Sequence, residues 1–345
     1  MRLFITGGCG FIGSHFVRYI LENHPEDSVF NFDKLTYAGN PKNLEDVENK
    51  FALRPSEAFL SAIVLTEEER EGGSRYIFKK GDIADKSLVE TVISEYKPDA
   101  IINFAAETHV DRSINDAEPF LLTNVLGVHN LLEIARKNNI GRFIQVSTDE
   151  VYGEIQEGAF TENSPLEPRS PYAASKAAGD LLALSYFTTH GLPVMVTRSA
   201  NAYGTHQYPE KLIPLMVTNL LEDKKVPVYG DGLQMRHWTH VLDHCSGIDM
   251  VLRKGIPGNV YNLGAANEPE YTNLDVVKLV LDFFAKDVSF ISYVKDRPGH
   301  DRRYRVDASK LNALGWNNKY NFKDSIGEVI EWYKSNKDWW QPLKS

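Results

Sequence analysis

Short apolar segments alternate with amphipathic segments of helical length through the first two-thirds of the chain. The strand-like runs occupy residues 3–6, 29–33, 100–104, 143–146 and 194–198, and the helical patterns occupy residues 12–23, 121–138 and 171–190. Strands and helices that take turns in this way are typical of βαβ units, whose parallel strands are covered by helices on both faces. The sequence therefore predicts an α/β fold with a doubly wound parallel sheet of the Rossmann type.

The alternation loosens after residue 203, where prolines interrupt shorter elements. We therefore expect a larger Rossmann domain over residues 1–203 and a smaller, C-terminal α/β lobe over residues 204–345. The chain could return to the sheet near residues 261–263. Residues 51–74 do not fit the pattern and are predicted to form an insertion that could cover a sheet edge or a subunit contact.

The charge and cysteine content exclude several classes of protein. A formal net charge of −9 argues against a nucleic-acid partner or an anionic membrane surface. The two cysteines, Cys9 and Cys245, form no CxxC pair, so we expect neither a disulfide scaffold nor a metal site. The sequence also shows no signal peptide and no apolar run long enough for a membrane span. These features predict a soluble, cytoplasmic protein.

A glycine-rich turn follows the first predicted strand and opens the first predicted helix. Gly7, Gly10 and Gly13 have the Gly-x-x-Gly-x-x-Gly spacing that lets a backbone approach a pyrophosphate at a helix N-terminus. Asp33 ends the second strand, where a carboxylate accepts hydrogen bonds from a ribose and repels a 2′-phosphate. Asp82 could meet the adenine edge or could be a simple turn residue. Together these features predict NAD as the cofactor.

Two further motifs carry groups suited to acid–base chemistry. Thr148, Asp149 and Glu150 follow the strand at 143–146, so they emerge at the carboxyl end of a parallel strand, where ligands bind. Tyr172 and Lys176 lie four residues apart on one helical face, where the cation can lower the pKa of the phenol and hold a ribose hydroxyl. A phenolate is a usable base for a sugar hydroxyl.

With these motifs the chain resembles the extended short-chain dehydrogenase/reductase family and, within it, the dTDP-glucose 4,6-dehydratases. The matching segments are residues 7–13, 33–40, 105–113, 147–153, 172–176, 208–214 and 296–304. The Thr-Asp-Glu segment at 148–150 and the Arg-Pro-Gly-His-Asp segment at 297–301 distinguish such dehydratases from most related epimerases.

The resemblance implies a hydro-lyase that converts dTDP-glucose to dTDP-4-keto-6-deoxyglucose. Tyr172 would take the proton of the C4 hydroxyl while hydride passes from C4 to NAD, and Lys176 and Thr148 would tune that step. Glu150 would then remove the C5 proton, and a protonated Asp149 would donate to the departing C6 hydroxyl, before hydride returns to C6.

The resemblance also implies which residues hold the two ligands. The predicted cofactor-binding residues are Gly7, Gly10, Phe11, Ile12, Gly13, Asp33, Lys34, Thr36, Asp82, Ile83, Ala105, Ala106, Thr123, Ser147, Tyr172 and Lys176. The predicted nucleotide-sugar residues are His109, Asn201, Lys211, Leu212, Pro227, Tyr229, Arg236, Asn267, Arg297 and Tyr304. Among them, Lys211, Arg236 and Arg297 would give a diphosphate the local positive charge that the acidic chain otherwise lacks.

Alternatives remain open on the sequence alone. Ala202 and His237 depart from the family pattern, so a UDP-linked glucose is an alternative substrate. A UDP-sugar 4-epimerase would use the same cofactor, but it needs no acid for O6 and so has no use for the pair of carboxyl groups at 149 and 150. A non-catalytic NAD-binding sensor would have no need of the Tyr172–Lys176 pair.

Two further expectations follow from the resemblance. NAD should stay tightly bound, because the hydride must wait for its own product. The family often forms homodimers through two long helices of each copy, and residues 121–137 and 171–190 are suitable for such a four-helix bundle.

Overall fold

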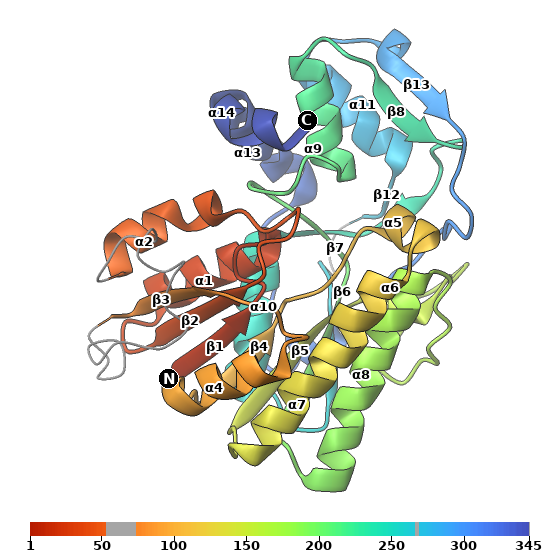
Figure 1. Cartoon of the computed structure of the whole chain (residues 1–345). Helices are drawn as coiled ribbons and strands as arrows, with labels where there is room; N and C mark the ends of the chain where they lie inside the picture. Colours follow the sequence, from red (N-terminus) through yellow and green to blue (C-terminus); the bar gives the residue numbers. More distant parts are fainter. Residues whose placement is uncertain (53–73, 266–268, 345) are drawn as a thin grey trace.

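Seven parallel strands form the central sheet of the computed structural model, which describes residues 1–52, 74–265 and 269–344 (Figure 1). Their spatial order is β11-β6-β5-β4-β1-β2-β3. The strands are β1 (Arg2–Thr6), β2 (Ser28–Asp33), β3 (Tyr76–Lys80), β4 (Ala100–Asn103), β5 (Arg142–Thr148), β6 (Val194–Ser199) and β11 (Val260–Leu263). The chain starts in the middle of the sheet, runs outward to β3, and crosses back to β4. This arrangement confirms the predicted doubly wound α/β fold.

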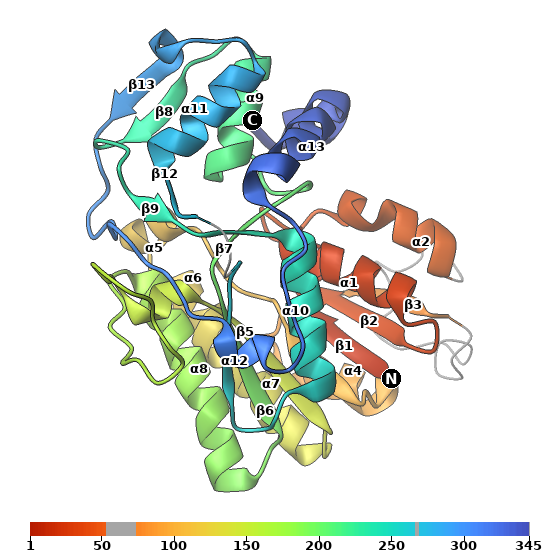
Figure 2. The same ribbon diagram turned by 180° about the vertical axis from the view of Figure 1, so that it is seen from behind.

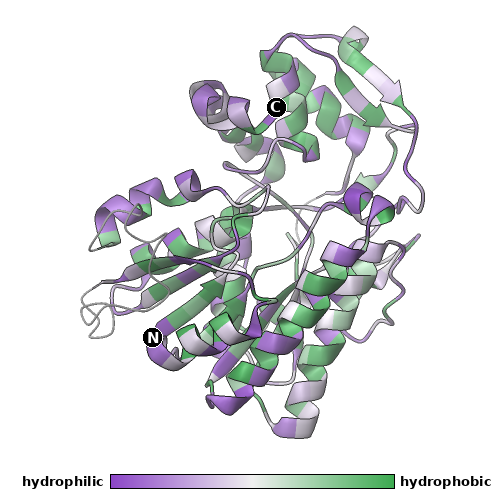
Figure 3. Ribbon diagram, in the orientation of Figure 1, coloured by the Kyte–Doolittle hydropathy of each residue, from purple (hydrophilic) through white to green (hydrophobic). Residues whose placement is uncertain are grey.

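Helices cover both faces of the sheet, as Figures 1 and 2 show from opposite sides. One layer contains α1 (Phe11–Asn23) and α10 (Val241–Lys254), and the other contains α4 (Lys86–Tyr96), α7 (Val128–Lys137) and α8 (Pro171–His190). The strands are therefore apolar on both faces, as Leu3, Phe4 and Ile5 of β1 illustrate, all three with no exposed surface. Figure 3 shows these apolar strands enclosed between the helices.

A smaller lobe faces the carboxyl ends of the sheet strands (Figure 1). Its principal elements are α9 (Leu212–Leu221), β8 (Val226–Tyr229), α11 (Asn273–Phe283), β13 (Ile291–Val294) and α13 (Phe322–Ser335). In it, β8 pairs in parallel with β13. A separate apolar core holds it together, with Met216, Val280 and Ile330 fully or almost fully buried.

Short elements complete the described chain. They are η1 (Pro41–Leu44), α2 (Glu45–Phe51), α5 (Val110–Asn115), α6 (Glu118–Leu121), η3 (Leu122–Gly127), η4 (Asp149–Tyr152), β7 (Asn201–Tyr203), β9 (Met235–Arg236), β10 (Trp238–His240), β12 (Tyr271–Thr272), η5 (Val288–Phe290), α12 (Ser309–Asn312), α14 (Lys337–Trp340) and η6 (Gln341–Lys344). The predicted insertion at 51–74 lies outside the described residues except at its two ends.

Segments after residue 204 belong both to the smaller lobe and to the part of the molecule built around the central sheet. The strand β11 pairs with β6 at the edge of the central sheet, and α10 packs against α1. The chain then returns to the smaller lobe. The division into a cofactor-binding part before residue 204 and a mainly nucleotide-sugar-binding part after it stays a prediction. In the described parts of the chain, no helix is both long and apolar enough to cross a membrane.

The carboxylate of Asp243 joins α10 to the segment that leads into α13. Its two oxygens accept hydrogen bonds from the backbone N–H groups of Lys319 and Tyr320, at 2.9 and 3.0 Å. The side chain is almost fully buried. A buried N–H group without an acceptor loses its hydrogen bonds to water and gains none in the protein. This carboxylate therefore fixes the path of the chain between the two parts of the molecule.

We therefore expect Asp243→Ala to lower the free energy of unfolding by about 2–4 kcal/mol, because it leaves two backbone donors unpaired. Urea denaturation followed by circular dichroism measures this change. The control is Asp324→Ala, since Asp324 is exposed in the first turn of α13, and it should change the unfolding free energy by less than about 1 kcal/mol. Equal effects of the two substitutions would contradict this role of Asp243.

Candidate active site

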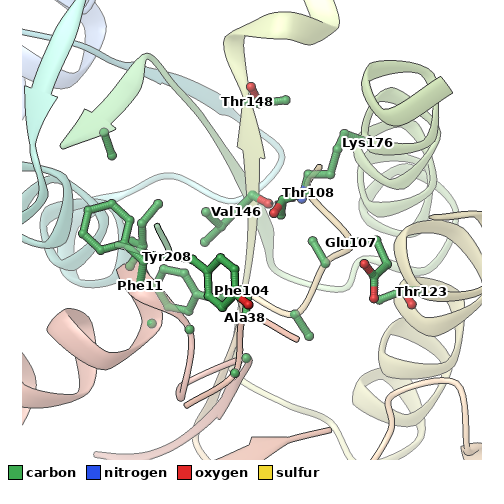
Figure 4. Close-up of a pocket in the computed structure, with 18 of the residues that line it drawn as sticks. Phe11, Ala38, Phe104, Glu107, Thr108, Thr123, Val146, Thr148, Lys176 and Tyr208 are labelled. Carbon is green, nitrogen blue, oxygen red and sulfur yellow. Dashed lines mark hydrogen bonds between the residues drawn. The ribbon is translucent and has the colours of Figure 1, made fainter. Parts of the chain in front are cut away.

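A cavity of about 320 Å³ opens at the carboxyl ends of the central strands. Its wall combines the turn between β1 and α1 with the ends of β2, β4 and β5 and with the first turns of α8. Figure 4 shows Phe11, Phe104 and Tyr208 gathered on one part of this wall, and Thr148 and Lys176 on another. Ligands of open α/β sheets bind in this crevice.

Glycines let the turn between β1 and α1 pack closely on the neighbouring backbone. Gly7 has a φ of +68°, and a Cβ there would lie 2.6 Å from the backbone N of Ala105. A Cβ on Gly13 would lie 2.2 Å from the carbonyl oxygen of Gly7. Gly10 caps α1 without a side chain, and no acidic residue occupies the first helical turn. The helix N-terminus is therefore open to an anion, which fits the pyrophosphate of NAD.

Two carboxylates fix the backbone at the end of the cavity where we expect the adenosine. Asp33 accepts from the backbone N–H groups of Cys9 and Leu35, at 2.8 and 2.7 Å. Burial raises the pKa of Asp33, and these two bonds oppose that rise. Asp82 pairs with Lys34 at 2.7 Å and accepts from the N–H of Ala84. Each Asp33 oxygen keeps a second lone pair for a ribose hydroxyl.

The end of β5 brings three acid–base groups together. Thr148 is the N-cap of η4, and its hydroxyl accepts from the Glu150 N–H at 3.2 Å. The same hydroxyl donates to Oδ1 of Asp149 at 3.3 Å. The other oxygen of Asp149 is buried and has no hydrogen-bond partner among the described residues. Asp149 thus has one free oxygen for a ligand.

Asp149 and Glu150 have unequal electrostatic surroundings. Burial and then the Glu150 charge raise the pKa of Asp149 well above its usual range. Burial also raises the pKa of Glu150 and Asp301 adds to that rise, but Arg297, Arg236 and Lys211 oppose it. The pKa of Asp149 thus rises further than that of Glu150, so Asp149 is the more readily protonated of the two. One residue is suited to act as an acid and its neighbour as a base.

Tyr172 and Lys176 both line the cavity from α8, which begins at Pro171 with a Ser170 N-cap. The predicted lowering of the phenol pKa by Lys176 is not what the structure shows. Burial and then Glu150 raise the pKa of Tyr172 well above its usual range, while a hydrogen bond with Thr148 lowers it. Lys176 donates instead to the Val146 carbonyl at 2.7 Å, and burial lowers its pKa to about 8.

Basic side chains approach the catalytic end from the smaller lobe. Arg236 is buried, stacks over the Tyr304 ring at 4.1 Å and donates to the Asp301 carbonyl at 2.9 Å. Lys211 donates to the Thr108 carbonyl at 3.1 Å. Arg297 lies 3.7 Å from Asp111. These cations create a positive region next to Glu150, which suits a diphosphate.

The structure brings most of the predicted site residues into one cavity. All sixteen predicted cofactor residues line it, as do Thr148, Asp149 and Glu150. Of the predicted nucleotide-sugar residues, Asn201 and Lys211 line it. The others that are described lie outside its lining, namely His109, Leu212, Pro227, Tyr229, Arg236, Arg297 and Tyr304. Asn267 lies outside the described residues.

Several lining residues were not predicted from the sequence. Glu107, Tyr208, Glu210 and His244 belong to them. Asn124, in the π-helical turn η3, holds Glu107 by accepting from its N–H and donating to its carbonyl, each at 3.0 Å. For Glu107, the position directly after Ala105 and Ala106 was an available signal, whereas His244 comes from a helix with no motif of its own.

Unpaired polar atoms in the wall show that the cavity suits a polar ligand. Ser147 Oγ, Asn201 Oδ1 and His244 Nδ1 are buried without a hydrogen-bond partner among the described residues. Such atoms are costly unless a ligand or water pairs with them. Within residues 1–52, 74–265 and 269–344, no group of three or more His, Cys, Asp or Glu side chains could hold a metal ion.

The fold and the site together define a dinucleotide-dependent enzyme that acts on a polar substrate, with Tyr, Lys and two carboxyl groups as its acid–base set. The family described as GDP-mannose 4,6 dehydratase matches residues 4–329, and the chain belongs to this family. A dTDP-glucose 4,6-dehydratase of Streptomyces niveus is 47% identical over 350 aligned residues, which cover 100% of this chain and 96% of that protein.

Solved structures agree with this assignment. DesIV, a dTDP-glucose 4,6-dehydratase from Streptomyces venezuelae solved with NAD and TYD bound, is 46% identical, with a TM-score of 0.89 and coverage of 99% of this chain and 100% of that one. A dTDP-glucose 4,6-dehydratase from Bacillus anthracis, solved in complex with NAD, is also 46% identical, with a TM-score of 0.87 and 99% coverage of both chains.

The Arg297 charge gives a test of the electrostatics. It holds down the pKa of Glu150, so Arg297→Gln should raise that pKa and move the acid limb of the kcat–pH profile to higher pH. The substitution should also raise KM. The control is Arg302→Gln, which removes a cation that pairs with Asp231. An acid limb at unchanged pH in Arg297→Gln would contradict the effect of the Arg297 charge on the pKa of Glu150.

Proposed function

We propose that this chain is an NAD-dependent dTDP-glucose 4,6-dehydratase, a hydro-lyase that converts dTDP-glucose to dTDP-4-keto-6-deoxyglucose. The observation that carries the proposal is the adjacent pair Asp149 and Glu150, whose surroundings raise the pKa of Asp149 further than that of Glu150. The pair lines the same cavity as Tyr172, Lys176 and the glycine-rich turn. An oxidation followed by an elimination needs these groups together.

The first step oxidises C4 of the sugar. When bound, NAD accepts hydride from C4 and later returns it to C6. The phenolate of Tyr172 takes the proton of the C4 hydroxyl, and Thr148 opposes the rise that burial and Glu150 give to the pKa of this phenol. The Lys176 ammonium, held by the Val146 carbonyl, adds positive charge to this wall and is suited to orient a ribose hydroxyl.

The second step removes water across C5 and C6. A ketone at C4 makes the C5 hydrogen acidic, so the Glu150 carboxylate can take it. Asp149, which burial keeps protonated, donates to the departing C6 hydroxyl. Glu150 then returns its proton to C5. The three cations near Glu150 stabilise its charged form and balance the diphosphate of the substrate.

The alternatives are less favoured. A 4-epimerase returns hydride to C4 and has no use for a buried acid beside the base. The relatives from Streptomyces niveus and Streptomyces antibioticus, which match over the full chain, are named for dTDP-glucose. This supports dTDP over UDP despite Ala202 and His237.

Incubation of the purified protein with dTDP-glucose and, separately, UDP-glucose tests the substrate. We expect the mass of dTDP-glucose to fall by one water without added NAD, because the cofactor is retained. A new C4 stereoisomer of unchanged mass would identify an epimerase. Loss of water from UDP-glucose alone would replace dTDP by UDP.

Substitution of the base tests the mechanism. Tyr172→Phe should lower kcat by about 10²–10⁴-fold, because it removes the group that takes the C4 hydroxyl proton. Bound NAD, measured after denaturation of the protein, should remain. The control is Tyr186→Phe on the same helix, whose hydroxyl donates to Glu133 at 2.6 Å and which does not line the cavity. Unchanged turnover in Tyr172→Phe would refute the mechanism.

A homodimer is part of the proposal. Leu121, Leu122, Leu126 and Leu181 are exposed by 55, 45, 44 and 57% on α6, η3 and α8, a larger apolar surface than single scattered side chains make. Two copies that bury these side chains would form a four-helix bundle. The free, buried cysteines Cys9 and Cys245 are in keeping with a reducing compartment and support a cytoplasmic location.

Charge introduced on this surface tests the dimer. We expect the unmodified chain to have about twice the mass of one copy by light scattering, and Leu126→Glu with Leu181→Glu to have the mass of one copy, because each glutamate would be buried unpaired in the interface. Ile256→Glu is the control, since Ile256 is also exposed but lies before β11. A monomeric unmodified chain would refute the dimer.

A further inference from the structure

The backbone N–H of Tyr172 lies in the first turn of α8, where an N–H group has no acceptor within its own helix. Pro171 has no N–H, and the hydroxyl of the N-cap Ser170 accepts from Ala173 at 3.1 Å. The N–H of Tyr172 instead donates to Oγ of Ser113, also at 3.1 Å and 59 residues away in the chain. A side chain of another segment therefore completes the start of the helix that carries the proposed base.

The Ser113 hydroxyl has a fixed direction. Ser113 is 1% exposed, and its Oγ donates its only hydrogen to the Val110 carbonyl at 2.6 Å, which leaves a lone pair for the N–H of Tyr172. On the other side, the Ser175 hydroxyl donates to the Tyr172 carbonyl at 2.7 Å. Both polar groups of the Tyr172 backbone are thus bound by serine hydroxyls, which fixes the point from which the phenol enters the cavity.

The helix that carries Ser113, α5, is also bound to the smaller lobe. Figures 1 and 2 show α5 between that lobe and the start of α8. Two residues before Ser113, the carboxylate of Asp111 accepts from the Tyr229 hydroxyl at 3.3 Å and lies 3.7 Å from Nη1 of Arg297. Tyr229 and Arg297 are both expected to bind the nucleotide diphosphate. The same helix therefore contacts the diphosphate-binding residues and the backbone of the base.

Further contacts join the start of α5 to the segment before α9. Nε2 of His109 and Nη2 of Arg112 each lie 3.4 Å from Oε2 of Glu210. Lys211, another expected diphosphate residue, donates to the Thr108 carbonyl at 3.1 Å. A shift of the smaller lobe relative to the sheet therefore displaces α5, and with it the acceptor of the Tyr172 N–H.

We propose that Ser113 is a positioning residue that links the diphosphate-binding end of the site to the base Tyr172. Ser113 does not line the cavity, so it acts through the Tyr172 backbone. While the smaller lobe holds α5 in place, the link sets the phenol where the C4 hydroxyl loses its proton. A displacement of about 1 Å at a reacting group costs about 10²-fold in rate. This inference rests on the proposed dehydration.

Transient kinetics of Ser113→Ala tests this role, because the two chemical steps use different residues. With the protein in excess over dTDP-glucose, the near-ultraviolet absorbance of the reduced cofactor rises as C4 is oxidised and falls after water is lost. A fit of the whole time course gives both rate constants. Ser113→Ala should slow the rise by about 10-fold or more, because it frees the backbone of Tyr172. The fall, which follows the steps of Asp149 and Glu150, should keep its rate.

The control is Ser185→Ala on α8, which should change neither phase. Ser185 is exposed, and its hydroxyl donates to the Leu182 carbonyl of the same helix at 2.7 Å. Equal slowing of both phases in Ser113→Ala, or a higher KM with unchanged rate constants, would overturn the positioning role, because either result describes a general loosening of the structure. An unchanged time course would overturn it as well.

Hydrogen exchange of the unmodified protein measures the link without a variant. The probe is dTDP, which carries the diphosphate but has no sugar for Tyr172 to contact. At about ten times its dissociation constant, dTDP should slow exchange of the Tyr172 N–H by about 10-fold, because openings that release this N–H also release the diphosphate. Unchanged exchange with dTDP bound would overturn the link. Failure of the unmodified protein to bind dTDP, or to remove water from dTDP-glucose, would instead refute the proposed function.

Discussion

A buried ion pair between α8 and β6 fixes the geometry on which the site depends. Nε of Arg198 lies 3.0 Å from Oδ2 of Asp180, and both side chains are almost fully buried. The guanidinium also stacks on the ring of Tyr152 at 4.8 Å, and Tyr152 donates to Asn262 at 2.7 Å. This network joins the helix that carries Tyr172 and Lys176 to the turn that carries Asp149 and Glu150. Because such a network has few satisfied arrangements, it specifies one relative position of the two.

The fold was largely predictable because its signals are local. The 13-residue helix α1 and the strands β1 and β2 follow directly from periodicity and from the glycine turn between them. The 20-residue α8 was predicted with its observed bounds, since Ser170 and Pro171 mark its start and Gly191 its end. The resemblance to known dehydratases then assigned roles to side chains that these elements bring to one sheet edge.

What could not be predicted depends on tertiary packing. The sequence places Tyr172 and Lys176 on one helical face, but only the fold shows that Lys176 binds the Val146 carbonyl and that burial raises the pKa of the phenol. Likewise, Arg236 is predicted as a nucleotide-binding residue, and only the fold shows that its guanidinium stacks on the ring of Tyr304 and donates to backbone carbonyls. A motif identifies a candidate residue. The protonation state and hydrogen-bond partners of that residue depend on segments that are distant in the sequence.

The unequal pKa shifts of Asp149 and Glu150 show how adjacent carboxyl groups can take two different roles. Both lose hydration, so both pKa values rise, but the smaller lobe supplies cations on the Glu150 side. The dehydration returns its hydride to the sugar, so it consumes no oxidant or reductant. The charges around the pair, rather than burial itself, therefore separate the two carboxyl groups in pKa and let adjacent residues supply an acid and a base.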